Sequence, residues 1–257
     1  MPTDPVTTAH TPRHPLLVSF SGIDGAGKST QIAHLREQLD YAGQRVQQII
    51  FWDDVACLKW MREGAGHTLF RGDKGVGTPE APIQRRDKNV RSPLMTMVRM
   101  GLYLIDAFSL RRIARAAGRS DADVVIFDRY LYDELANLNL RNRAARWFIR
   151  CLLALVPHPH LAFVLDADPV QARARKPEYP LDFLILNRRA YLELGEFLGG
   201  IIIPPLPLPQ AKAAVMSHVL PRLRSAIPPR SIAGHGAGQQ SLSQKKTDGQ
   251  SARPVAS

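Results

Sequence analysis

The sequence predicts an α/β protein of three layers, in which helices cover both faces of a parallel sheet. Between residues 15 and 226, short apolar runs alternate with longer segments of helical periodicity, an order typical of parallel sheets flanked by helices. Several runs, such as residues 124–127, are apolar without interruption, as a strand buried on both faces requires. One domain of this length can hold all of these elements.

Five strands and five helices are expected along residues 15–226. The strands are expected at residues 16–20, 45–51, 123–128, 161–167 and 200–203. The helices are expected at residues 27–43, 94–118, 141–156, 180–198 and 210–225, and Gly43 and Gly118 stand where the first two would end. The flanking segments lack apolar periodicity, so residues 1–14 predict a flexible arm and residues 227–257 a disordered basic tail.

Composition narrows the class of protein. Hydrophobic residues make up 45% of the 257 residues and charged residues 22%, which is ordinary for a globular protein. No apolar run is long enough to cross a bilayer, and the N-terminus has no signal-peptide pattern. Cys57 and Cys151 match no metal or redox spacing. A cytoplasmic protein without a membrane partner is therefore expected.

The net charge of +11 raises the question of an anionic partner. The tail, residues 227–257, has four basic residues against Asp248, and residues 85–91 form a second basic cluster. No RNA- or DNA-binding motif is present. We therefore assign the basic excess partly to an anion site and partly to a solvated tail, and expect no nucleic acid partner.

The segment "FSGIDGAGKSTQ", residues 20–31, predicts a phosphate-binding loop. Gly22, Gly27, Lys28 and Ser29 satisfy the pattern G-x-x-x-x-G-K-[ST] between a strand and a helix. The glycines allow backbone N–H groups to converge, Lys28 would contact the β- and γ-phosphates, and Ser29 would bind Mg²⁺. The nucleotide-binding residues expected from this loop are Gly22, Asp24, Gly25, Ala26, Gly27, Lys28, Ser29 and Thr30. The donor is thus a nucleoside triphosphate.

The loop alone does not separate a kinase from a GTPase or an ATPase motor. A regulatory GTPase would need an N-K-x-D segment after a later strand, and the sequence has none. The third expected strand ends in Asp128, as a motor ATPase would have it, but Arg129 and Tyr130 follow at once.

With these residues the chain resembles the thymidylate kinase family of P-loop nucleoside monophosphate kinases. The loop is followed about a hundred residues later by a strand ending in "DRY", residues 128–130. The segment "LAFVLDADPVQARARKPEYP" resembles the family's strand and basic lid, and "NRRAYLEL" resembles the returning helix, with Tyr191 in the matching place. The resemblance covers residues 16–224 and is weakest at 51–98.

The resemblance implies a P-loop kinase fold with a five-stranded parallel sheet and a small basic lid at about residues 173–182. It implies ATP and Mg²⁺ as the donor pair, a nucleoside monophosphate as acceptor and a homodimer. Asp128 and Arg129 would face the acceptor and the transferred phosphoryl group, with Asp128 beside Ser29 as a candidate Mg²⁺ ligand. The lid cations Arg173, Arg175 and Lys176 would close over the phosphates and stabilise the charge that spreads in the transition state.

Two departures from the family concern the acceptor. Asp53 and Asp54 follow the second strand, where the family has an Arg-Glu-Pro-Gly-Gly-Thr-like run. Asp53 would be a catalytic base toward a hydroxyl acceptor, whereas beside a phosphate acceptor these acids would hold Mg²⁺ or an arginine, or form a solvated turn. In the long helix the family's Asp-Arg pair corresponds to residues 106 and 107, Asp-Ala here, so the thymine-reading arginine is missing. Neither Arg99 nor Arg111 and Arg112 can be assigned that role.

A third departure is the long segment of residues 62–93, rich in glycine and arginine, which predicts a functional loop. Its basic residues would bind the acceptor's phosphate or form an exposed loop: Arg85, Arg86, Lys88 and Arg91. Four aromatic residues are candidates for stacking on a base, although each is more often a core residue: Trp52, Trp60, Phe70 and Tyr103.

Three hypotheses of function follow. The first is transfer of the γ-phosphoryl group of ATP to a nucleoside monophosphate, with dTMP giving dTDP. The second is a P-loop kinase for another small molecule, such as a nucleoside or a sugar. The third is a regulatory protein that binds nucleotide without turnover.

Overall fold

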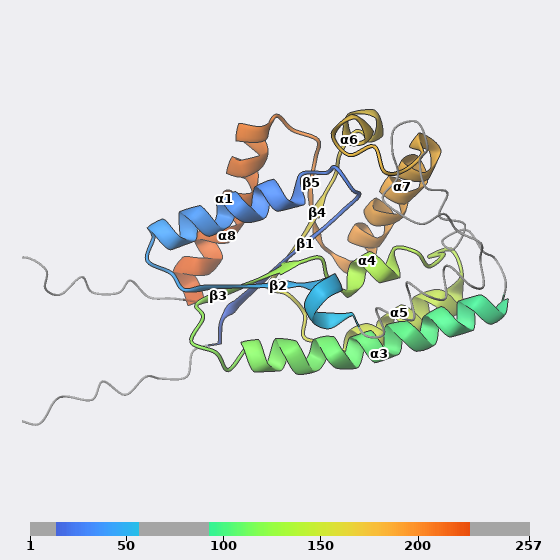
Figure 1. Cartoon of the computed structure of the whole chain (residues 1–257). Coiled ribbons are helices and arrows are strands. Elements are labelled where there is room, and N and C mark those ends of the chain that lie inside the picture. Colours follow the sequence, from blue (N-terminus) through green and yellow to red (C-terminus); the bar gives the residue numbers. More distant parts are fainter. Residues whose placement is uncertain (1–13, 57–92, 227–257) are drawn as a thin grey trace, which may run out of the picture.

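The parallel sheet is the centre of the fold (Figure 1). A computed structural model describes residues 14–56 and 93–226. The strands are β1 (Leu16–Ser21), β2 (Val46–Ile50), β3 (Val124–Asp128), β4 (Leu161–Leu165) and β5 (Ile201–Ile203). They form one parallel sheet in the order β2-β3-β1-β4-β5. The predicted fold class is confirmed, and β1, which precedes the glycine-rich loop, is the central strand.

The five predicted helices are present, with ends that differ by a few residues from prediction. They are α1 (Lys28–Tyr41), α3 (Pro93–Ala117), α5 (Arg143–Leu155), α7 (Leu181–Leu198) and α8 (Leu208–Ala226). Three short elements were not predicted: the π-helical turn η1 (Phe51–Val55), α4 (Leu131–Leu135) and α6 (Pro169–Arg175). Segments of five to seven residues are too short for a helical period to show in a sequence. All three follow the carboxyl ends of strands.

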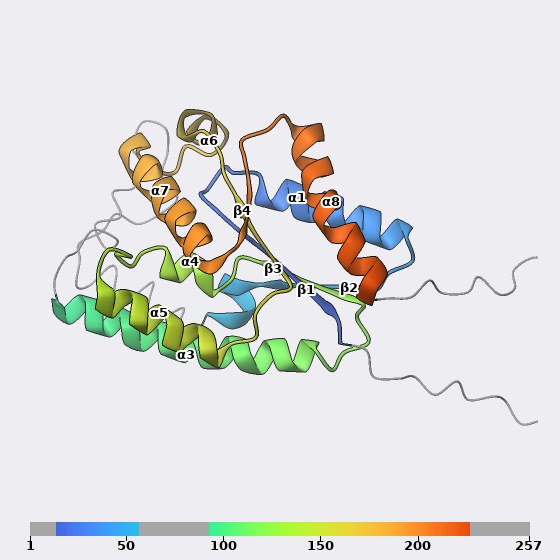
Figure 2. The same cartoon turned by 180° about the vertical axis from the view of Figure 1, so that it is seen from behind.

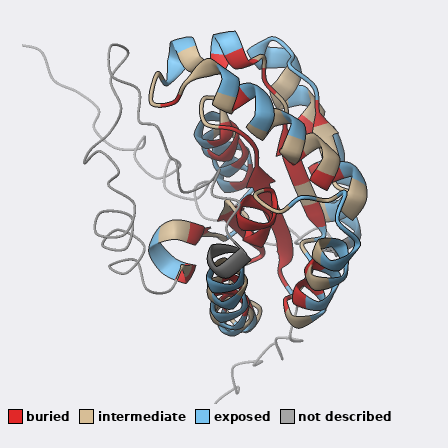
Figure 3. Ribbon diagram, turned by 90° about the vertical axis from the view of Figure 1, so that its right-hand side faces the viewer, coloured by how far each residue is buried: buried red, intermediate tan, exposed pale blue. Residues whose placement is uncertain are grey.

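Side chains alternate between the two faces of the sheet, and each face has its own set of helices (Figures 1 and 2). Val124 and Ile126 of β3 pack with α1 and α8, whereas Val125 and Phe127 pack with α3, α5 and α7. Figure 3 shows the sheet as a buried layer between helices whose outer faces are exposed. This burial on both faces explains why β3 and β4 appear in the sequence as unbroken apolar runs.

The ends of the central strands fix the position of the site. In register, Phe20 of β1 pairs with Asp128 of β3, and Ser21 pairs with Val164 of β4. The loop that leaves β1 therefore lies beside the end of β3 on one side and the end of β4 on the other. In an open parallel sheet, ligands bind outside the carboxyl ends of the strands where neighbouring connections diverge.

Several predictions concern residues outside the described ranges. These are the N-terminal arm, the long loop with its basic cluster, the C-terminal tail, and the residues Cys57, Trp60 and Phe70. Within residues 14–56 and 93–226, no helix is long and apolar enough to span a membrane.

Candidate active site

The glycine-rich loop between β1 and α1 is tightly packed against its neighbours. Gly22 and Gly25 have φ angles of 141° and 81°, a region that residues with a Cβ rarely adopt. A Cβ on Gly22 would lie 2.5 Å from the carbonyl oxygen of Leu165 in β4, and one on Gly25 would collide with the carbonyl of Ala172 in α6. Glycine is therefore required at both positions for the loop to rest against β4 and α6.

Lys28 begins α1 and is held inside this loop. Its side chain is buried, and its Nζ donates hydrogen bonds of 2.8 and 2.9 Å to the carbonyl oxygens of Gly22 and Ile23. Burial, together with the positive charge of Arg129, lowers the pKa of Lys28 to about 8, although Asp133, Asp24 and Asp128 oppose this shift. The loop thus presents a desolvated ammonium group beside the N-terminus of a helix, the arrangement that binds phosphate oxygens.

Arg129 lies at the end of β3 in a left-handed backbone conformation, with φ of 69°. Its backbone N–H donates to the carbonyl of Phe20 at 3.0 Å, which ties the end of β3 to β1. One guanidinium nitrogen donates to Asp133 at 3.0 Å and the other to Asp24 of the loop. Burial opposes the charged form, but Asp133, Tyr191 and Asp24 more than compensate and raise the pKa of Arg129. Arg129 is therefore a permanent cation held between two carboxylates.

Asp133 of α4 is a buried carboxylate whose two oxygens accept four hydrogen bonds. Oδ2 accepts from the Ser21 hydroxyl at 2.7 Å and from the Tyr130 backbone N–H at 3.1 Å. Oδ1 accepts from the Tyr191 hydroxyl at 2.8 Å and from Arg129. Strand β1, the turn after β3 and helix α7 thus meet at one side chain, which orients Arg129 from behind.

Asp24 joins the loop to the segment that follows α6. Besides Arg129, its carboxylate contacts the Lys176 ammonium at 3.8 Å, and Lys176 also pairs with Glu178 at 3.2 Å. Burial alone would raise the pKa of Asp24, but the charges of Arg129, Lys28 and Lys176 outweigh it and hold that pKa below its usual value. Asp24 is therefore ionised at neutral pH.

Comparison with known proteins points in the same direction as this geometry. No protein-family model matches the chain. It is 26% identical over 207 residues to a probable thymidylate kinase of Archaeoglobus fulgidus, which is 78% of this chain and 92% of the relative. It is 28% identical over 214 residues to a probable thymidylate kinase of Pyrobaculum aerophilum (80% and 96%), and 29% identical over 166 residues to a thymidylate kinase of Polaromonas sp. (63% and 72%). The chain is a divergent relative of the thymidylate kinases.

In this relative of the thymidylate kinases, Asp128 stands next to the loop as predicted from the sequence. It is the last residue of β3 and is half-buried. Burial raises the pKa of Asp128, whereas the nearby charges of Arg129 and Lys28 oppose that shift. Ser29 and Thr30 lie in the first turn of α1 with exposed side chains. The roles of these three residues toward Mg²⁺ and phosphate stay predictions.

The predicted lid cations have different surroundings. Lys176 contacts the loop, and Arg173 is half-buried on α6. Arg175 is exposed, and its Nε donates to the carbonyl oxygen of Gln171 at 3.2 Å. Arg175 also lines a cavity of about 490 Å³ between the glycine-rich loop, the end of β4 and the chain after β5, together with Ala26, Gln31, Asp168 and residues 204–207. This cavity adjoins the phosphate loop and is large enough for a nucleoside base.

Asp53 and Asp54 lie in the turn η1 that follows β2. Asp54 closes η1, because its Oδ2 accepts a 2.7 Å hydrogen bond from the backbone N–H of Ile50. Asp53 is exposed in the same turn, at the end of an edge strand of the sheet. One of the interpretations of these acids in the sequence was a solvated turn, and this interpretation describes Asp54. A catalytic role for Asp53 stays a prediction.

Position 107, where the family has its thymine-reading arginine, faces the core. Ala107 and Asp106 are both fully buried on α3. Tyr103, one turn earlier, is also buried, and Trp52 packs its ring edge-on against Phe51. These placements favour the core interpretation of both aromatic residues over a base-stacking one.

Sequence reasoning missed two acids next to the site, Asp133 and Glu134. Both are buried in α4, and burial together with the charge of Glu134 raises the pKa of Tyr103 on α3. The available signal was an acid four residues after Arg129, the spacing of an ion pair within one helical turn. It was overlooked because no helix was predicted there.

Proposed function

We propose that the protein transfers the γ-phosphoryl group of ATP to a nucleoside monophosphate, with dTMP as the acceptor and dTDP as the product. The observation that carries this proposal is the convergence of Lys28, Arg129 and Asp128 at the carboxyl ends of the neighbouring strands β1 and β3. The names of the relatives favour thymidylate as the acceptor.

The donor site would be built from the loop and its surroundings. Lys28 and the loop N–H groups would hold the β- and γ-phosphates, and the cavity beside Arg175 would hold the base. Within the described residues, no group of three or more His, Cys, Asp or Glu residues forms a protein-only metal site. Mg²⁺ in phosphoryl transfer needs only one or two protein ligands in addition to phosphate oxygens, so Ser29 and Asp128 fit that requirement.

Arg129 would stabilise the negative charge on the transferred group. In the structure it is shared by Asp24 and Asp133. Incoming phosphate oxygens would compete with Asp24 for the guanidinium group, while Asp133 would keep holding it from the other side. The cation would then reach the phosphoryl group already oriented, and a preorganised charge lowers the barrier because it need not reorganise during the reaction.

A phosphate acceptor requires no strong base, because its attacking oxygen is already an anion. A hydroxyl acceptor, such as a nucleoside or a sugar, remains the second candidate because Ala107 replaces the family's arginine. A nucleotide-binding protein without turnover is the third candidate for the same reason.

The test is a substrate screen with the full chain, ATP and Mg²⁺. Diphosphate formation would be measured for a panel of nucleoside monophosphates, with nucleosides and sugars in parallel. We expect dTMP to be the best acceptor and Lys28→Ala to abolish turnover. Phosphorylation of only nucleosides or sugars would support the second candidate, and ATP binding without any turnover would support the third.

We also propose that two copies associate through the first half of α3. Large apolar side chains are exposed along this stretch: Met97, Val98, Leu104 and Ile105. Contiguous exposed apolar surface of this kind marks an interface, and a helix face can pair with its own copy across a twofold axis.

A further inference from the structure

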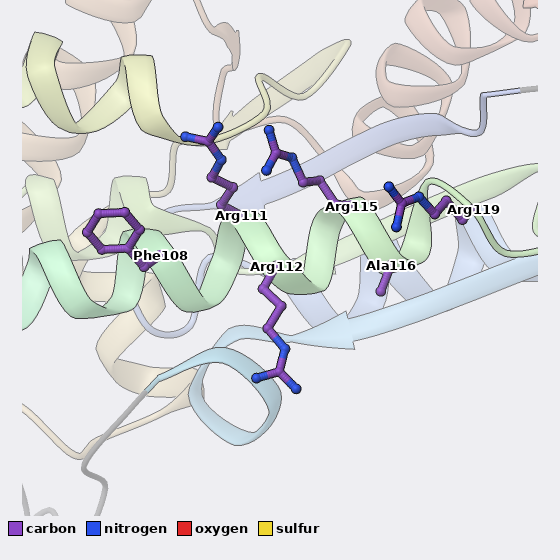
Figure 4. A pocket seen from close by; sticks show the side chains of 6 residues that line it. All are labelled: Phe108, Arg111, Arg112, Arg115, Ala116 and Arg119. Carbon is purple, nitrogen blue, oxygen red and sulfur yellow. The ribbon is translucent and has the colours of Figure 1, made fainter.

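We propose that the second half of α3 binds the phosphodiester backbone of a nucleic acid. Four arginines form the arginine face: Arg111, Arg112 and Arg115 on this part of the helix, and Arg119 in the turn that follows it. Figure 4 shows Arg111, Arg115 and Arg119 extending to one side of α3, and Arg112 to the other.

The arginine face is a cluster of positive charges that make no direct contact with a carboxylate in the described part of the chain. Arg112, Arg115 and Arg119 are exposed and Arg111 is half-buried. Within residues 14–56 and 93–226, none of the four guanidinium groups has a hydrogen bond or an ion pair to a carboxylate. The sequence has no acid from residue 107 to residue 120.

A structural role at the end of the helix accounts for only part of this charge. Cations in the last turn of a helix interact favourably with its dipole, and Arg115 lies in the last turn of α3. The effect falls off within one turn, however, so it gives no reason for Arg111 and Arg112. Four unpaired arginines also repel one another, and bringing them together is favourable once an anionic partner is bound.

The spacing of the row fits a repeating anion. Arg111 and Arg115 stand four residues apart on α3, which is roughly 6 Å of helix rise, and Arg119 continues the row in the turn after the helix. A nucleic acid strand has one phosphate at every nucleotide, so a row of this length can contact two or three successive phosphates. All four residues are arginines, whose planar groups bind phosphate oxygens in pairs.

The shape of the surface favours a polymer over a small anion. The arginine face lines an open depression of about 480 Å³, together with Phe108 and Ala116, and every lining residue comes from α3 or from the turn directly after it. Sites for small molecules enclose the ligand with groups that converge from several elements, which is not the case here. An extended polyanion gains affinity from many weak contacts along an open surface.

The surroundings favour a nucleic acid over a membrane. Membrane-binding helices place several apolar side chains beside their basic ones. From residue 109 to the end of α3 there are two large apolar side chains, of which Leu110 is buried and Ile113 is partly buried against the core. Exposed Phe108, at the edge of the depression, offers one aromatic ring on which a base could stack.

The arginine face is also separate from the candidate active site. The last turns of α3 extend past the end of α5 and lead to the start of β3, whereas the site lies at the ends of β1 and β3 (Figures 1 and 2). Binding there does not depend on the proposed kinase activity.

The test is fluorescence anisotropy of the full chain with labelled oligonucleotides of mixed sequence, single-stranded and duplex, at 50 to 200 mM KCl. If four phosphates are neutralised, single-strand affinity should fall roughly fiftyfold over this fourfold rise in salt, at a slope of about −0.7 per phosphate. The double variant Arg115→Gln with Arg119→Gln should bind more weakly, and its affinity should fall only about sevenfold over the same range. Kinase turnover should not change.

The matched control is Arg143→Gln with Arg146→Gln, which removes the same charge from exposed positions on α5. It should keep the salt dependence of the unmodified chain. Equal loss in both double variants would show a response to net charge alone and would overturn the proposal. Vesicles of anionic lipid give a further outcome. If the chain binds them more strongly than it binds oligonucleotides, and the Arg115→Gln, Arg119→Gln variant loses this binding, the partner is a membrane and the proposal is overturned. Absence of binding at 50 mM KCl would also overturn it.

Discussion

Replacing Asp133 by Asn tests whether Arg129 is positioned from behind. The carboxylate accepts four hydrogen bonds, from Ser21, Tyr130, Tyr191 and Arg129. An asparagine keeps the shape but has only one acceptor oxygen, so two of the four donors would face an NH₂ group. It also removes the negative charge beside the Arg129 guanidinium, and the side chain of Asp133 is only 1% exposed, so solvent cannot replace what is lost.

The expected effect on stability follows from this burial. Removing one partner of a buried ion pair costs about 3–5 kcal/mol, out of the roughly 5–15 kcal/mol that holds a typical domain folded. Tyr191→Phe is the milder counterpart, because it removes one donor and leaves the carboxylate with three. Tyr191→Phe should lower the free energy of unfolding by about 1 kcal/mol. Urea denaturation followed by circular dichroism measures both free energies of unfolding.

The expected effect on turnover is larger for kcat than for the KM of ATP. Preorganised charge at the reacting group contributes about a hundredfold to a thousandfold to rate. Because Asp133→Asn retains Arg129 but loosens it, kcat should fall between about tenfold and a hundredfold. The KM of ATP should stay within about twofold, since Lys28 and the loop are intact. Tyr191→Phe should keep kcat within about threefold.

Steady-state phosphorylation of dTMP at a temperature where both variants are folded gives these constants. Asp24→Asn serves as a comparison, because it removes the other carboxylate of Arg129 and leaves Asp133 in place. If Asp133→Asn loses stability but retains full kcat, Asp133 is structural and the positioning argument is wrong. An increase in the KM of ATP with unchanged kcat would equally contradict it.

Four further predictions concern the glycine-rich loop and α3. Because the pKa of Lys28 is lowered to about 8, its ammonium group loses its proton as the pH rises through 8, and kcat/KM for ATP should fall. The Lys28→Arg variant should not show this decrease between pH 7 and 10. The same lowering from 10.5 means that the unfolded chain binds the extra proton, so this residue's contribution to the free energy of unfolding should rise from pH 8 to 10.5. Gly25→Ala should abolish ATP binding in calorimetry, because its Cβ would collide with Ala172, whereas Gly43→Ala, which has open space around it, should retain binding. Ile105→Glu should shift the protein from dimer to monomer in light scattering, and a dimer that persists would rule out pairing through the first half of α3.

The central sheet was predictable from the sequence because burial on both faces leaves a local signal. A strand that helices cover on both faces favours apolar residues at every position, and residues 124–127 show this without any knowledge of their partners. The loop was predictable for a similar reason, since the φ angles of Gly22 and Gly25 and their contacts with β4 and α6 allow no other residue. Both constraints therefore leave a local pattern in the sequence: an unbroken apolar run for the strand, and closely spaced glycines for the loop.

The network around Asp133 was not predictable, because its partners are far apart in the chain. Ser21 and Tyr191 precede and follow it by 112 and 58 residues. Nothing near Asp133 in the sequence distinguishes a buried acceptor of four hydrogen bonds from an acid on an exposed helix. The expectation for Asp54 had the same weakness, since its hydrogen bond to Ile50 depends on the shape of a single turn that no periodicity reveals.

The charge balance of the site indicates what nucleotide binding must add. Lys28, Arg129 and Lys176 are balanced in the structure by Asp24, Asp128 and Asp133, so the cluster has no net positive charge to offer a triphosphate. A triphosphate with one Mg²⁺ still carries about two negative charges, and in a desolvated site these need compensation. Within residues 14–56 and 93–226, Arg173 and Arg175 of α6 are cations close to this cluster whose charge is not matched by a carboxylate. The contact of Lys176 with Asp24 already holds the end of α6 against the loop. We therefore expect nucleotide binding to bring α6 closer to the phosphates, which is the movement that the predicted basic lid requires.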